Sequence, residues 1–112
     1  MKFYYKGQLI RTSKSHHYTH AIIIVEDNKF KCVSCSSSRE LAEKALDNLG
    51  AYKNYRVWLS VKDGTYKPKD RWSYNIEKMR SEAINRYGSV DEALNYWKNA
   101  IGKYEIVEIE EA

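Results

Sequence analysis

Apolar and polar residues alternate in short runs along the first third of the chain, a pattern that is typical of β-strands. Two such runs are Phe3–Arg11 and Tyr18–Glu26, and the second has an isoleucine-rich centre. Asp27-Asn28 then predicts a tight turn into a third run, Lys29–Ser36. The pattern therefore predicts an antiparallel meander of three strands at the N-terminal end.

Helical spacing begins after these runs. Ser37-Ser38-Arg39-Glu40 contains an S-x-x-E capping box, and the apolar residues that follow recur at helical intervals until Gly50. A second apolar stripe runs from Trp72 to Tyr87, and a third follows the capping box Ser89-Val90-Asp91-Glu92. The sequence thus predicts two or three helices.

Alternation returns between the first and second of these predicted helices. The residues from Tyr55 to Lys62 predict a half-buried strand, and Asp63-Gly64 is typical of a hairpin turn. Thr65–Pro68 is expected either to return as a short strand or to leave as a loop. Near the other end of the chain, Tyr104–Glu110 predicts a final strand.

Composition is consistent with one folded domain. The 112 residues are 43% hydrophobic and 13% aromatic, enough for one core and unlike a disordered chain. Together with the pattern, this predicts a single α+β domain over residues 1–112, in which an antiparallel sheet (the three-strand N-terminal meander plus later strands) is packed by two or three helices. Ten tyrosines and three tryptophans are more than a small core would bury, so we expect some of them at the interface of a homo-oligomer or in a pocket.

No membrane segment is predicted. The longest apolar run, Ala21–Val25, is far shorter than a membrane span, and the N-terminal residues lack the apolar stretch of a signal peptide. We therefore expect a cytoplasmic protein without a membrane partner.

Charge is unevenly distributed along the chain. The formal net charge is +4, and residues 1–36 carry six lysines and arginines against two acidic residues. The tail from Lys103 carries four glutamates against that one lysine. Such a basic N-terminal third favours polyanionic partners, with an ordinary solvated surface as the alternative.

The segment from Arg11 to His20 joins two predicted strands and is rich in cations, hydroxyls and imidazoles. A guanidinium can clamp a phosphate with two parallel N–H bonds, lysine adds a point charge, and a tyrosine ring offers a face for a base. Candidate ligand-binding residues in this segment are Arg11, Thr12, Ser13, Lys14, His16, His17 and Tyr18. The alternative is a polar connection that contacts only water.

A second basic and aromatic patch lies within residues 62–75. Cations that alternate with aromatic rings are typical of sites for single-stranded nucleic acid or for a nucleotide base. The candidate ligand-binding residues here are Tyr66, Lys67, Lys69, Arg71 and Trp72. Trp72 also begins the second apolar stripe, so for this residue core packing is favoured over ligand contact.

The two cysteines form the motif Cys32-Val33-Ser34-Cys35 inside a predicted strand. Residues three apart on a strand point to opposite faces, so we expect two separate packed thiols without a shared role. His16 and His20 could join the cysteines in a two-plus-two zinc site, but the order is unusual and His17 crowds it. We therefore predict no metal and no cofactor.

Motifs that identify the common enzyme classes are missing from the sequence. It contains no glycine-rich phosphate loop, no G-x-S-x-G elbow, no H-E-x-x-H and no zinc-deaminase pair, so we predict that the protein is not an enzyme. A metal-independent phosphodiesterase built from His16 or His17 with Tyr18 and Arg11 is the alternative.

The opening pattern also resembles a group of known proteins. It looks like the start of small proteins of bacteriophages and mobile elements. The residues that carry this likeness are Lys2-Phe3-Tyr4-Tyr5, Leu9 to Lys14, Tyr18-Thr19-His20-Ala21, and Cys32 to Ser36, which lead into a capped helix. Over about the first 50 residues the chain is similar to the phage sponge proteins that sequester the cyclic ADP-ribose signal of Thoeris defence.

This resemblance implies a non-enzymatic oligomer in the cytoplasm of a bacterial host, with nucleotide pockets at subunit interfaces. It makes Arg11 the phosphate clamp and leaves the base to Tyr18, Tyr66, Trp72 or Tyr74. The favoured hypothesis is therefore capture of a cyclic or ADP-ribose-type nucleotide, a phosphate-bearing small molecule. A module that binds nucleic acid or inhibits a defence protein, such as a CRISPR inhibitor, is the alternative.

Overall fold

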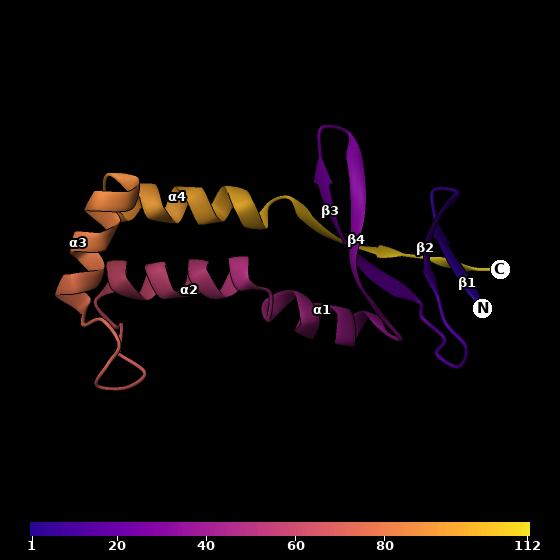
Figure 1. Ribbon diagram of the computed structural model, residues 1–112, viewed down its shortest axis with the longest axis horizontal. Coiled ribbons are helices and arrows are strands. Elements are labelled where there is room, and N and C mark those ends of the chain that lie inside the picture. The colour runs from indigo at the N-terminus through magenta and orange to yellow at the C-terminus, as the bar shows by residue number, and fades with distance from the viewer. The chain divides into compact units, whose positions relative to one another are not determined.

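Residues 1–112 contain six strands and four helices in the computed structural model (Figure 1). The chain divides into a sheet unit, Met1–Leu49 with Gly102–Ala112, and a helical unit, Gly50–Ile101. Antiparallel sheets and helices together make an α+β fold, as the sequence predicts. The prediction of a single domain stays a prediction.

The sheet unit holds all six strands and one helix. Its elements are β1 (Lys2–Tyr5), β2 (Gln8–Thr12), β3 (His20–Glu26), β4 (Lys29–Ser36), α1 (Arg39–Asp47), β5 (Tyr104–Glu108) and β6 (Glu110–Glu111). The helical unit consists of α2 (Gly50–Asp63), α3 (Ile76–Tyr87) and α4 (Val90–Ile101).

The strands form two antiparallel sheets, ordered β2-β1-β6 and β4-β3-β5, so the predicted three-strand meander is wrong. The first predicted strand is in fact a hairpin, because Lys6 and Gly7 both adopt positive φ angles of 48° and 78° and reverse the chain. The predicted turn at Asp27-Asn28 is confirmed, with φ angles of 51° and 63° between the paired strands β3 and β4.

The central strand of the second sheet is buried on both faces. Ile22 and Ile23 are neighbours on β3, so their side chains point to opposite sides of the sheet, and both are buried. Ile23 clusters with Ala21 and Val107, while α1, whose Ala42 is buried, packs against β3, β4 and β5. The isoleucine-rich run thus forms the core of the sheet unit.

In the helical unit, α2 and α4 run side by side in opposite directions (Figure 1), and α3 packs against both. The core consists of Trp58, Val61, Ala83, Ala93 and Leu94.

The predicted strand from Tyr55 to Lys62 is wrong, because these residues belong to α2. Tyr55, Trp58 and Val61 are spaced by three and pack into the helical core, whereas Val57 and Leu59 are 36% and 38% exposed. The apolar residues of this segment fit both an alternating strand pattern and a helical spacing. The side chains that are buried are those that follow the helical spacing.

The observed bounds of α3 and α4 are close to the predicted ones. α4 follows a cap at Ser89, and α3 ends at Gly88, which has a φ of +102°. However, α3 begins only after the N-cap Asn75, so Trp72 lies outside it and is 80% exposed. The interpretation of Trp72 as a core residue is therefore wrong.

No helix in the chain combines the length and the apolar composition needed to cross a membrane.

Candidate functional site

A groove with a volume of 520 Å³ lies on the helical unit, between α2 and the loop that follows it. We call it the cationic groove, and its lining residues are Lys53, Arg56, Val57, Ser60, Thr65, Tyr66, Lys67 and Lys69. Four of these eight residues are cationic and none is acidic. The hydroxyl residues Ser60 and Thr65, the Tyr66 ring and the apolar Val57 complete the lining, so the groove suits an anion with a flat apolar part.

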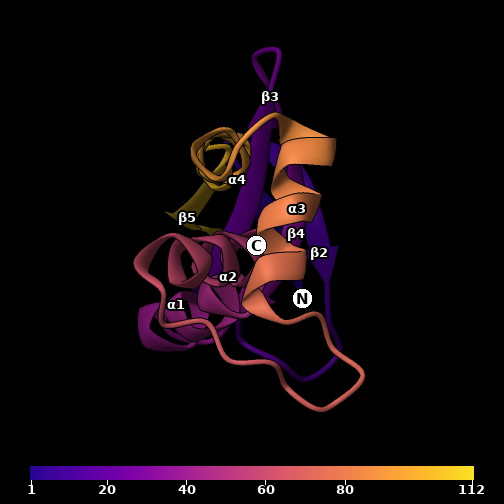
Figure 2. The ribbon, with the colours of Figure 1, turned by 90° about the vertical axis from the view of Figure 1, so that its left-hand side faces the viewer.

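The chain reversal after α2 brings the two halves of the groove together. Gly64 has a φ of +76°, which allows the backbone to turn back at the end of the helix. The amides of Thr65 and Tyr66 then donate to the Ser60 carbonyl over 3.0 and 3.1 Å. The loop that follows α2 extends away from the helices (Figure 2). Its residues Lys67 and Lys69 line the groove together with residues of α2.

The α2 half of this groove was missed by the sequence reasoning. Lys53, Arg56, Val57 and Ser60 are spaced as i, i+3, i+4 and i+7, which places them on one face of a helix. That helical spacing is the signal for these residues in the sequence, but the alternating pattern of residues 55–62 predicts a strand and hides it.

Side-chain contacts hold the outer part of the loop. The Tyr66 hydroxyl donates to the Tyr74 carbonyl over 2.7 Å. The Trp72 amide and the Ser73 hydroxyl donate to the Asp70 carboxylate, which holds the pKa of Asp70 below its ordinary value. Arg71, whose guanidinium lies 4.8 Å from the centre of the Trp72 ring, is outside the groove lining.

The whole formal net charge of the protein resides in the helical unit. Residues 50–101 contain ten lysines and arginines against six aspartates and glutamates, a net charge of +4. The sheet unit contains nine of each and is formally neutral. Folding places the acidic tail beside the N-terminal strands, since β6 pairs with β1 and β5 pairs with β3.

The predicted ligand residues of the 11–18 segment lie in the sheet unit and largely contact one another. The Arg11 guanidinium lies 5.7 Å from the centre of the Tyr18 ring, and the His16 ring stacks on Tyr18 at 5.6 Å. Phe3 meets the same ring edge-on at 5.2 Å. Tyr18 is therefore engaged by protein groups, which leaves less of its ring for a base.

Two further contacts tie this segment to its surroundings. The His17 Nδ1 lies 3.4 Å from the Glu111 carboxylate, and the Ser13 hydroxyl accepts from the His16 amide over 2.9 Å. Thr12 and Lys14 are exposed. The segment is thus a connection between two sheets, and its His17 lies against the acidic strand β6.

The cysteine pair differs from its prediction. Cys32 and Cys35 lie with their Sγ atoms 3.8 Å apart, although residues three apart on a regular strand point to opposite faces. The register of β4 slips between Ile22 and Ile23 of β3, which leaves Val33 as the extra residue of a β-bulge. No three histidine, cysteine or acidic residues lie close enough together to hold a metal ion, so the two-plus-two ligand set does not assemble.

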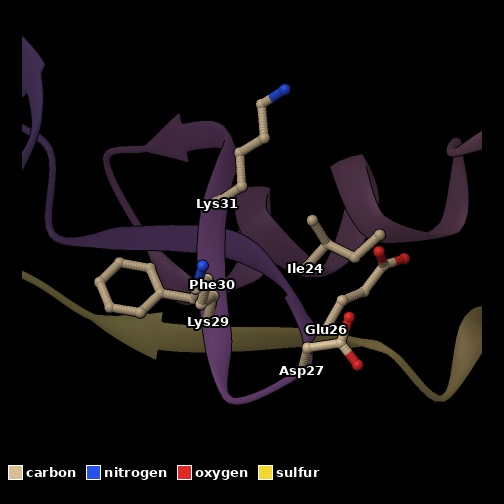
Figure 3. A pocket seen from close by; sticks show the side chains of 6 residues that line it. All are labelled: Ile24, Glu26, Asp27, Lys29, Phe30 and Lys31. Carbon is tan, nitrogen blue, oxygen red and sulfur yellow. The ribbon is translucent and has the colours of Figure 1, made fainter.

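A second hollow of 520 Å³ lies at the β3–β4 hairpin (Figure 3). Glu26 and Asp27 lie together on one side of it, and Lys29 and Lys31 flank the apolar Phe30 on β4, so the lining carries both acids and bases. Carboxylates repel an anion, and the cationic groove is therefore the better site for a phosphate-bearing ligand.

The fold and the site together define a small α+β protein with an open cationic groove on its helical unit. Comparison with known protein families, with curated proteins and with solved structures found no match.

Proposed function

We propose that this protein binds a phosphate-bearing nucleotide in the cationic groove and returns it chemically unchanged. The observation that carries the proposal is the composition of the groove, in which four cations and no carboxylate surround 520 Å³ of space. Ligand sites for small molecules commonly have volumes of about 300–1,000 Å³. Lys53, Arg56, Lys67 and Lys69 would contact the phosphates, and the Tyr66 ring would lie against the base.

The form of this function follows from the sequence resemblance. A sponge that sequesters a cyclic or ADP-ribose-type nucleotide signal, as a phage counter-defence protein in the bacterial cytoplasm, needs only tight binding. Homo-oligomerisation belongs to the same proposal. It is supported by the exposed rings of Trp72, Tyr74 and Tyr96, because tyrosine and tryptophan are favoured at protein interfaces.

Purified protein mixed with cyclic ADP-ribose, ADP-ribose and ATP tests this function. After rapid removal of free ligand, we expect heat to release a nucleotide whose mass has not changed, and native mass spectrometry to record a ligand-bound oligomer. Failure of all three nucleotides to bind at low salt would sink the nucleotide proposal. A converted product would instead identify an enzyme.

A comparison of two double variants, one inside the groove and one outside it, tests whether the groove is the binding site. The double substitution Lys67→Ala with Lys69→Ala should weaken nucleotide binding about tenfold or more, because each removes a charged phosphate contact. Arg80→Ala with Lys98→Ala removes the same charge from exposed positions of the same unit outside the groove, and should change affinity less than about twofold. Equal losses in the two variants would argue against a site in the groove.

Single-stranded nucleic acid is the second candidate ligand, and one observation favours it. Trp72 is exposed beside Arg71 on the loop that forms one side of the groove, and such rings serve as stacking platforms for bases. An oligonucleotide ligand would quench Trp fluorescence, and its affinity would fall steeply as salt rises. Nucleotide binding without oligonucleotide binding at low salt would exclude this candidate.

A further inference from the structure

The β-bulge in β4 places two thiols side by side where the sequence pattern predicts opposite faces. Cys32 and Cys35 are both half-buried, and their Sγ atoms lie 3.8 Å apart. The Cys32 Sγ also lies 3.7 Å from the Ser34 carbonyl oxygen, which orients it within the bulge. A disulfide needs about 2.05 Å between the sulfur atoms, so closure requires the thiols to approach by nearly 2 Å.

We propose that Cys32 and Cys35 form a reversible dithiol site that exchanges with low-molecular-weight disulfides of the glutathione type and closes to an intramolecular disulfide. The inference stands on the bulge and the sulfur contact alone, and it does not depend on nucleotide binding. Neither thiol is used by the proposed site in the helical unit, because both lie in the sheet unit.

The exchange balances as two successive displacements. The Cys32 thiolate attacks one sulfur of glutathione disulfide, a mixed disulfide forms, and one glutathione thiolate leaves and takes up a proton. Cys35 then loses its proton to solvent and attacks the Cys32 sulfur, which breaks the mixed disulfide and releases the second glutathione. The protein dithiol is oxidised by two electrons, and glutathione disulfide is reduced to two glutathione thiols.

The environment of Cys35 makes the closing step slow at neutral pH. Burial, together with the charge of Cys32 and its hydrogen bond, raises the pKa of the Cys35 thiol to about 11, although the positive charge of Arg11 opposes this rise. In the mixed disulfide Cys32 has neither a thiolate charge nor an S–H group, so burial is the cause that still raises the pKa of the attacking Cys35 thiol. Only the thiolate attacks, so closure should accelerate as pH rises.

Treatment of the full chain with a glutathione redox buffer at pH 8, followed by alkylation and mass spectrometry, tests the proposal. We expect a monomer that is lighter by about 2 Da and resists alkylation, and that dithiothreitol returns to the dithiol form. Cys32→Ser and Cys35→Ser should each stop at a single glutathione adduct. Wild-type protein that stops at stable adducts, or that links through intermolecular disulfides, would overturn the proposal.

A matched control tests whether the rate of disulfide closure depends on the bulge or only on the short sequence separation of the two cysteines. The double variant Ser34→Cys with Cys35→Ser keeps two thiols, but Ser34 points to the opposite face from its neighbour Cys35. The wild-type pair should close at least about tenfold faster than this rearranged pair. Equal rates of closure would contradict a role for the bulge.

Discussion

Trp58 and Trp72 lie in the same unit and in opposite environments. Trp58 is 5% exposed and belongs to the helical core, while Trp72 is 80% exposed and contacts Arg71. Apolar area removed from water stabilises the fold, so the two indoles contribute very differently to it.

The two tryptophans therefore make a paired test of stability. Trp58→Ala should lower the free energy of unfolding by about 3–5 kcal/mol, because it leaves a cavity in the helical core. Trp72→Ala should change it by no more than about 0.5 kcal/mol, as an exposed substitution usually does. Urea denaturation followed by circular dichroism measures both, and a large loss for Trp72→Ala would contradict its exposed position.

At the same scale, the residues of the groove could be predicted only in part. The basic and aromatic patch within residues 62–75 is predictable from its mixture of cations and rings, and its Tyr66, Lys67 and Lys69 do line the groove. Lys53 and Arg56 share one face with Val57 and Ser60 only if the segment is helical, so the strand prediction separates them from the loop that the chain reversal at Gly64 brings beside α2.

Among the elements, the short helix connections depend on particular backbone angles. Gly88 ends α3 with a φ of +102°, and its amide donates to the Ala83 and Ile84 carbonyls. Gly50 begins α2 and has no positive φ. At both positions an added Cβ would meet no atom within 4 Å, so only the backbone angle distinguishes them.

Alanine at these two glycines should therefore have opposite effects. Gly88→Ala should destabilise the protein by about 1–2 kcal/mol, because a left-handed conformation is strained for a residue with a Cβ. Gly50→Ala should be neutral or stabilising by up to about 1 kcal/mol, since alanine restricts the unfolded chain. Thermal melts compare the two, and similar losses at both sites would indicate a steric cause.

Helices and strands were predictable to different degrees. The capped helix at Val90–Ile101 and the strand Lys29–Ser36 appear within their predicted bounds, since their caps and turns are encoded locally. The helix α2 was mistaken for a strand, because its alternating apolar residues fit both periods and its packing against α4 decided between them.

At the scale of the whole molecule, we expect the distribution of charge between the two units to govern anion binding more than the net charge does. The sheet unit is formally neutral and the helical unit carries +4, although the N-terminal third of the sequence looked basic. Contacts such as Lys103 with Glu26, at 3.3 Å, pair opposite charges within the sheet unit.

Two variants with equal net charge can test this distribution. Lys67→Ala with Lys69→Ala should elute from a phosphocellulose column at clearly lower salt than wild type, because the groove faces the phosphate groups. Lys29→Ala with Lys31→Ala removes as much charge from the neutral sheet unit and should shift elution less than half as far. Equal shifts would mean that net charge alone governs retention.

The sequence by itself determined the α+β class, the turn at Asp27-Asn28, the capped helices and the basic-aromatic loop, because each depends on neighbouring residues. Only the tertiary structure decided the division into two sheets, the face of α2 that joins the groove, and the contact between Cys32 and Cys35. These features depend on strand pairing, packing and a bulge register, which bring together residues that local patterns treat separately.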